Sequence, residues 1–304
     1  MELFRSWVLA VLLLLVPVAK AQNRGVYPLG MSAINSGMTP QPGFTYANQL
    51  LFYSRDKAKD NDGNELEISG SNDVLMDLNT LNWVSEFNLF GNAGYSAAVT
   101  IPVAKNQLTS DIHGQISGGS GLADAYFMPL ILSWTEERFA IRAIYGVLAP
   151  TGKYSAGASD NVGSGYWTHT FSSGQSFYLS EDRKWVLSMF EIYEFHTEQE
   201  GTGVHPGQTL SLDASLLSEV SRSESLQVQL GLVGYFQRQT TEKTGPEVTA
   251  ELKNERYAVN ALGAAVNFVY PRPRANLSLR YFKEFANRST YEGDSIQISG
   301  SIAL

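Results

Sequence analysis

The order of short and long connections constrains the fold of this chain more than any other feature of its sequence. From Phe44 to Leu304, twelve strand-like segments are separated alternately by short turns and long polar loops. Short turns are predicted at Gly91, Glu136-Glu137, Asp182-Arg183, Ser223 and Pro271-Arg272-Pro273. Long loops are predicted near residues 58–72, 105–119, 151–164, 199–207, 241–254 and 287–293. An even number of strands, with short turns at one end and long loops at the other, is typical of an outer-membrane β-barrel.

Most of the segments have the period of a β-strand. In residues 92–104, for example, Tyr95, Val99 and Ile101 fall on one face and smaller or polar residues fall between them. Soluble strands average about 5–6 residues, whereas a tilted membrane strand needs roughly 9–11, and these segments belong to the longer class. We therefore expect an all-β fold, a transmembrane antiparallel β-barrel, in preference to a soluble β-protein. The strands are predicted near residues 44–57, 73–89, 92–104, 120–135, 138–150, 165–180, 184–198, 208–222, 224–240, 255–270, 274–286 and 294–304.

The first 21 residues have the form of an export signal. Arg5 gives a basic start, and the apolar run from Trp7 to Ala19 is shorter than the roughly 20 residues of a membrane-spanning helix. Ala19-Lys20-Ala21 fits the small-x-small rule for cleavage, which predicts cutting before Gln22. A membrane anchor is the alternative, and the short run disfavours it. We expect residues 1–21 to be a signal peptide and the mature protein to be delivered to a bacterial outer membrane.

Residues 22–43 form a separate segment ahead of the barrel, which occupies residues 44–304. This leader is rich in glycine and proline and cannot form one regular helix or strand. It also carries the apolar residues Met31, Ile34 and Met38. Either a free periplasmic segment or a lumen plug would fit, and the apolar side chains favour partial insertion into the lumen.

Composition excludes several classes of partner and chemistry. Only 17% of the residues are charged, the net charge is -8, and no basic patch stands out, so no nucleic-acid partner is expected. The chain has no cysteine, which rules out a disulfide scaffold, a thiolate metal site and a cysteine nucleophile.

Residues 121–134, GLADAYFMPLILSW, are apolar on both faces of the predicted strand. One face carries Tyr126, Met128, Leu130, Leu132 and Trp134, and we expect it to meet lipid, with Tyr126 and Trp134 in the two aromatic girdles. The other face, with Phe127 and Pro129, is then expected to line the lumen. Because a closed barrel has no free edge to accommodate a proline, Pro129 should mark a bulge or an unpaired ladder position.

Several short motifs resemble one family of outer-membrane proteins, named after the meta pathway of phenol degradation. They are TPQPG at 39–43, Asp62-Gly63, GLAD at 121–124 followed by Pro129, APTGKY at 149–154, and Asn161, Gly163 and Gly165 ahead of Tyr166-Trp167. The family usually has a further glycine where this chain has Ala123. The resemblance implies a transporter-like barrel that assists the entry of aromatic or other hydrophobic compounds, and it implies the barrel-assembly machinery as a partner.

Three other patterns resemble chemical sites and fail in detail. Residues 60–64 lack the glycine position of a calcium loop, and 150–153 lack the spacing of a phosphate loop. The histidines His113, His169, His196 and His205 show no metal-binding spacing. His169 lies near Ser172 and Ser173, but residues three and four apart do not face each other on a strand. We predict no catalytic residues, no metal and no cofactor.

Residues predicted to face the lumen are the candidate functional residues. Arg142, Asp213, Arg280 and Glu284 follow from strand alternation, whereas Glu191 is assigned inward only because a mid-strand carboxylate facing lipid is costly. An ion-pair lattice that fills a narrow barrel is as good an interpretation of these charges as a ligand site. The full set of candidate pore-lining residues is Phe127, Pro129, Arg142, Glu191, Asp213, Tyr235, Arg280 and Glu284.

The sequence therefore predicts an outer-membrane channel for passive uptake of small hydrophobic or aromatic compounds. Its expected partners are outer-membrane lipids and the solute itself. Two alternatives stay open: an outer-membrane lipid hydrolase, and a structural or adhesive barrel that acts through its outer loops.

Overall fold

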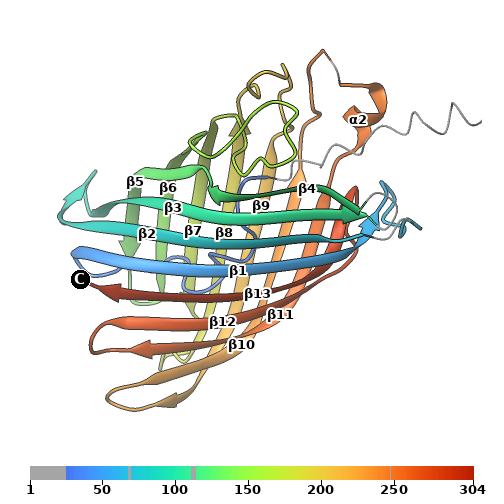
Figure 1. The fold of residues 1–304 in the computed structure, drawn as a ribbon. Coiled ribbons are helices and arrows are strands. Elements are labelled where there is room, and N and C mark those ends of the chain that lie inside the picture. The colour runs from blue at the N-terminus through green and yellow to red at the C-terminus, as the bar shows by residue number, and fades with distance from the viewer. Residues whose placement is uncertain (1–24, 68–69, 111–113, 247) are drawn as a thin grey trace, which may run out of the picture.

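The β-ladder closes on itself. The computed structural model describes residues 25–67, 70–110, 114–246 and 248–304, so the predicted signal peptide lies outside the described residues. β1 pairs with β2 on one side and with β13 on the other, and β3 pairs with β2 and β5 (Figure 1). The strands are β1 Gly43–Lys59, β2 Asn72–Leu89, β3 Ala93–Ser110, β4 Gly114–Leu122, β5 Ala125–Thr135, β6 Phe139–Ala149, β7 Thr168–Tyr178, β8 Trp185–His196, β9 Thr209–Arg222, β10 Gln227–Gln239, β11 Ala258–Tyr270, β12 Ala275–Glu284 and β13 Thr290–Ala303. Without β4, the remaining strands form the predicted twelve-stranded antiparallel barrel, which is thereby confirmed.

Two elements differ from the sequence prediction. β4 was expected to be partly loop and partly the start of the next strand, but it pairs with the outer half of β3, from Val103 opposite Leu122 to Ser110 opposite Gly114. A short helix, α2 Ala250–Asn254, interrupts the loop before β11 and is capped by the Thr249 side chain, which accepts from Leu252 N. No helix in the described ranges is long and apolar enough to cross a membrane.

The outer wall carries a broad apolar band. Because Cβ atoms alternate along a strand, one side chain in two points away from the lumen, and these are large and exposed across the sheet. An exposed apolar band of this extent is stable in lipid rather than in water. Aromatic side chains pack together at the short-turn end, as Trp83 does with Tyr95, and at the loop end, as Phe171 does with Phe195. Members of the band include Phe52, Leu75, Ile101, Leu230, Leu262, Leu279 and Ile296.

β5 contains a bulge that reverses the predicted faces at its start. The register shifts between Phe127 and Leu130 against β6, and between Ser96 and Ala98 against β3. The expected bulge beside Pro129 is therefore present. The extra residue at the bulge shifts which residues face lipid and which face the lumen. A prediction that alternates regularly from Trp134 back to the start of β5 therefore assigns the wrong side to the residues before the bulge.

The lumen assignments of Phe127 and Pro129 are consequently wrong. Phe127 is 43% exposed on the outer wall, and Pro129 is exposed beside it. Met128 instead packs against the core inside the barrel, and Tyr126 shares a hydrogen bond with Thr170 of the inner face of β7. Only the later residues of the predicted lipid face, such as Trp134, keep their assigned side.

Asp124 joins three of the family motifs into one knot at the loop end of the barrel. Asp124 is 5% exposed, and its carboxylate accepts from Gly152 N at 2.9 Å, from Ser164 N at 2.7 Å and from the Ser164 hydroxyl at 2.5 Å. The Asn161 side chain bridges the same loop, accepting from Ser155 N and donating to Ser155 O. The motifs at 121–124, 149–154 and 161–165, distant in sequence, therefore meet at one buried carboxylate.

Replacing Asp124 with alanine should loosen this knot without opening the barrel. Losing charge-assisted hydrogen bonds to buried donors costs about 3 kcal/mol, which raises the population of the locally open loop on the order of a hundredfold. The measurement is the rate of trypsin cleavage after Lys153 in the folded protein. Asp60→Ala is the matched control, because Asp60 also accepts from two backbone amides, Asp62 N and Asn64 N, but does so in open solvent. Equal cleavage of D124A and D60A would contradict this role.

Candidate functional site

The described part of the leader ahead of β1, residues 25–42, passes into the lumen and packs there as part of the core. Tyr27, Leu29 and Ala33 are buried in one apolar cluster with side chains from the barrel wall. Met31 and Ile34 pack against that cluster. The wall contributes, among others, Ile131, Ile144, Phe190, Ile192, Leu217, Val233 and Phe282. The lumen is therefore filled by a segment of the chain that belongs to no strand of the ladder.

Two buried carboxylates of the wall accept hydrogen bonds from the leader. Asp213 on β9 accepts from Gly30 N at 2.9 Å, from Ser32 N at 3.0 Å and from the Tyr27 hydroxyl. Glu194 on β8 accepts from Tyr27 N at 2.7 Å. An irregular buried segment needs partners for its amides, and these carboxylates supply them.

Donors on the opposite strands bind the leader's carbonyl groups. Arg280 on β12 donates to Gly30 O at 2.7 Å and to Met31 O at 2.8 Å. The Gln297 amide and the Tyr53 hydroxyl both donate to Leu29 O, each at 2.7 Å. Asp213 and Arg280 thus hold the amide and the carbonyl of the same residue, Gly30. Farther along the leader, Arg142 donates from Nε to Ser36 O at 2.8 Å.

Gly30 lies where the leader bends between Asp213 and Arg280. Its φ is +84°, a left-handed conformation that favours glycine. A Cβ atom at this position would lie 2.8 Å from the Phe282 ring and 2.8 Å from the Gln297 amide. The chain can bend between Asp213 and Arg280 only because this residue has no side chain.

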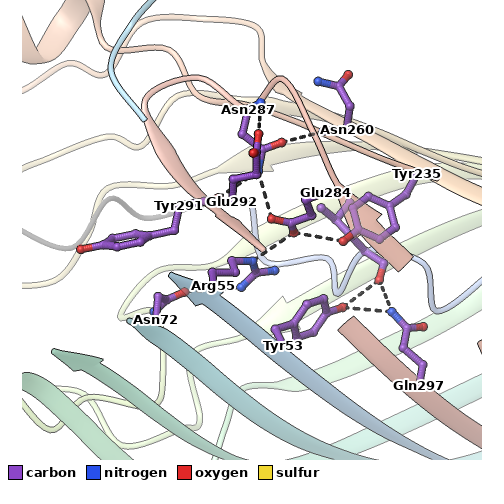
Figure 2. A network of polar contacts seen from close by, with 11 residues as sticks. Tyr53, Arg55, Asn72, Tyr235, Asn260, Glu284, Asn287, Tyr291, Glu292 and Gln297 are labelled. Atoms are coloured by element: carbon purple, nitrogen blue, oxygen red, sulfur yellow. Dashed lines mark hydrogen bonds and ion pairs between the residues drawn. The ribbon is translucent and has the colours of Figure 1, made fainter. Parts of the chain in front are cut away.

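A second polar network connects the leader's contacts to the outer rim. Arg55 donates from Nε to Glu284 Oε1 at 3.0 Å, and the Tyr235 hydroxyl donates to the same oxygen at 3.0 Å (Figure 2). Asn287 Nδ2 donates to the other oxygen of Glu284 at 3.0 Å. The Arg55 guanidinium also lies over the Tyr53 ring, whose hydroxyl binds the leader. Arg55 and Glu284 form one buried ion pair. The other predicted lumen charges, Arg142, Asp213 and Arg280, bind polar groups of the leader instead.

Five of the eight candidate lumen residues point inward. Two of the three exceptions, Phe127 and Pro129, follow from the β5 bulge. The third, Glu191, lies on the outer face of β8, where Gln175 Nε2 donates to its carboxylate at 2.8 Å. Its inward assignment is wrong because the buried positions of β8 are the even ones, up to Glu194. The five inward residues are Arg142, Asp213, Tyr235, Arg280 and Glu284.

Sequence reasoning missed several residues that hold the leader. Glu194 was detectable in principle, because alternation from Val186 places it inward. Tyr53 and Gln297 also lie on alternating strands, but neutral residues there carry no signal that separates a leader contact from ordinary wall packing. The partner of each depends on a segment far away in sequence.

Within the described residues, no hydrogen bond joins His169 to Ser172 or Ser173, the pairs considered for a lipid hydrolase. His169 points to the outer face, where its Nδ1 lies 2.9 Å from the Tyr145 hydroxyl. Ser172 is on the buried face of the same strand. His196 shares its Nδ1 hydrogen bond with Thr168. His113 lies outside the described residues.

Comparisons with known proteins agree with this architecture. An outer membrane channel from Pseudomonas putida F1 aligns over 92% of this chain and 100% of its own, with a TM-score of 0.71 and 13% identity. The β domain of the Bordetella autotransporter BrkA aligns over 87% of this chain and 100% of its own, with a TM-score of 0.53 and 10% identity. At such identities the likeness shows the fold alone, and no curated protein sequence matches the chain. The model of the family described as "Putative MetA-pathway of phenol degradation" matches residues 55–299, and the chain therefore belongs to that family.

Proposed function

We propose that the protein is an outer-membrane channel for passive uptake of small hydrophobic or aromatic compounds, closed at rest by its own leader. The observation that carries the proposal is the leader's manner of attachment. The wall binds it through side chains, and it takes no part in the β-ladder. A segment outside the ladder can leave the lumen while all strand pairs of the barrel stay intact, because local opening costs less free energy than global unfolding.

The solute class follows from the wall that the leader covers. Ile131, Ile144 and Phe190 form an apolar surface, and Asp213 and Arg280 add polar groups beside it. A passage lined in this way favours solutes with an apolar body and a polar substituent, since selectivity in channels comes from the lining groups. The description of the family as part of phenol degradation is consistent with such solutes.

Export and membrane insertion complete the proposal. The apolar outer band supports residence in a lipid bilayer, and the signal peptide predicted before Gln22 supports export of the mature chain. The outer-membrane location is also that of the P. putida channel with the same fold.

Removing residues 22–38 should open the pore of the channel while leaving the strands of the barrel paired. In liposomes, small aromatic solutes and ions should enter faster through the deletion variant than through the full mature chain, because the segment that fills the lumen is gone. Stopped-flow influx and single-channel conductance both measure this. Deletion of Ala250–Asn254, the outer-loop helix, serves as the control and should leave both unchanged. Unchanged conductance after the leader deletion would refute closure by the leader.

Arg280→Gln should destabilise the closed state without removing the leader. The substitution takes away charged donors to Gly30 O and Met31 O, and hydrogen bonds to charged groups are worth about 1.5–3 kcal/mol each. The open probability in single-channel recordings should therefore rise at least about tenfold. Arg222→Gln is the control, since Arg222 pairs with Glu219 near the turn before β10 and does not contact the leader. The same open probability for R280Q and R222Q would argue against the leader as the gate.

A further inference from the structure

The Tyr27 side chain is a phenol held inside the lumen. Tyr27 is 7% exposed, and its ring stacks on Phe190, with centroids 5.5 Å apart and planes 27° from parallel. Its hydroxyl donates to Asp213 Oδ2 and accepts from Ser32 N at 3.2 Å. The ring thus has an aromatic surface on one side and the hydroxyl has a carboxylate at its end.

The carboxylate of Asp213 takes its hydrogen bonds from the leader alone. Within the described part of the chain its donors are the Tyr27 hydroxyl, Gly30 N and Ser32 N, and no side chain of the wall donates to it. Asp213 is fully buried in β9. When the leader withdraws, this carboxylate loses every donor that the structure gives it, and a buried carboxylate without donors is costly.

A replacement ligand must therefore provide both a ring for Phe190 and a hydrogen-bond donor for Asp213. A phenol provides both, as Tyr27 does. A hydrocarbon such as toluene has the ring without the donor. Anisole, which is phenol with its hydroxyl methylated, keeps the ring and the oxygen but has no proton to donate.

We propose that the place filled by the Tyr27 side chain is a binding subsite for phenolic solutes, a proposal that rests on the channel function above. Tyr27 occupies the subsite in the closed state, and an incoming phenol replaces it in the open one. Since Tyr27 is part of the same chain, it competes at an effective concentration in the millimolar range. A phenol therefore occupies the subsite only when its concentration is high or when the leader has already withdrawn.

The opposing view is that Tyr27 only anchors the leader and that its pocket recognises nothing else. Truncating the side chain separates the two views, because a cavity of ring size in a protein core accepts a small aromatic molecule that fits it. The remaining contacts of the leader, to Glu194, Arg280 and Gln297, do not involve the Tyr27 ring. Tyr27→Ala should therefore leave the carboxylate and the aromatic surface in place beside an empty space.

The test is isothermal titration of the full mature chain in detergent, with phenol and anisole as paired probes. Wild type, in which Tyr27 fills the subsite, corrects for partitioning into micelles. Y27A should bind phenol at least about tenfold more tightly than anisole, the worth of one hydrogen bond to a charged acceptor. Adding Asp213→Asn to Y27A should reduce that preference to about threefold or less. Adding Glu219→Gln instead should leave it unchanged, because Glu219 is on the same face of β9 but pairs with Arg222.

Equal affinities for phenol and anisole in folded Y27A would overturn the subsite. A preference that survives D213N, or no phenol binding at all, would do the same. If Y27A does not fold, the variant lacking residues 22–38 also exposes Asp213, and the same comparison applies to it. The titration is independent of transport: a barrel that passes solutes but binds both probes equally contradicts the subsite alone. A barrel that prefers phenol but passes nothing contradicts the uptake function alone.

Discussion

The hydrogen-bond ladder between β1 and β13 is the interaction on which the rest of the structure depends. It runs from Thr45 opposite Ala303 to Lys59 opposite Thr290 and joins the first strand to the last. Without it, both edge strands would present unpaired backbone groups to lipid, which has nothing to pair with them. Closure also separates two environments, because alternate side chains of each strand face lipid or lumen. The apolar outer band and the leader-binding side chains of the lumen both depend on this separation.

The lumen shows how a β-barrel can bind an irregular piece of its own chain. Strand backbone is already paired in the ladder, so only side chains are available to satisfy the leader. Carboxylates of the wall accept hydrogen bonds from the leader's backbone amides, and guanidinium, amide and hydroxyl groups of the wall donate hydrogen bonds to its carbonyl oxygens. This arrangement packs the lumen without adding a strand. When the leader withdraws, the wall exposes polar groups that have lost their hydrogen-bond partners, and these groups lie beside an apolar surface.

The sequence pattern predicted the barrel because the strand period and the loop lengths repeat in every hairpin. An error in one hairpin therefore does not change the predicted fold. Side-chain direction within a strand is less secure. One extra residue at the Pro129 bulge reversed Phe127 and Pro129, while β9, β10 and β12 placed Asp213, Tyr235 and Arg280 correctly, because the register shift between β9 and β10 lies at Val228 and Gln229, away from these residues. Glu191 was misplaced by an argument from cost alone, which a hydrogen bond from Gln175 offsets on the outer wall.

Tertiary partners were beyond the sequence for a simple reason. Nothing local to Asp124 indicates that it binds amides 28 and 40 residues away, and nothing local to Asp213 indicates that a leader more than 180 residues earlier supplies its donors. Short motifs in a fixed order indicated the family, but only the fold shows that three of them, at 121–124, 149–154 and 161–165, meet in one loop knot.

The central claim is that the leader opens independently of the barrel, and native-state hydrogen exchange tests it most directly. In the folded full chain, amides of the leader that bind wall side chains, those of Tyr27, Gly30, Ser32 and Gly37, should exchange through local opening. Their rates should exceed those of ladder amides in β9 and β12 by orders of magnitude, because local opening requires less free energy than global unfolding. Leader amides that exchange only as slowly as the ladder would show that the segment is a fixed part of the core, and would contradict the account.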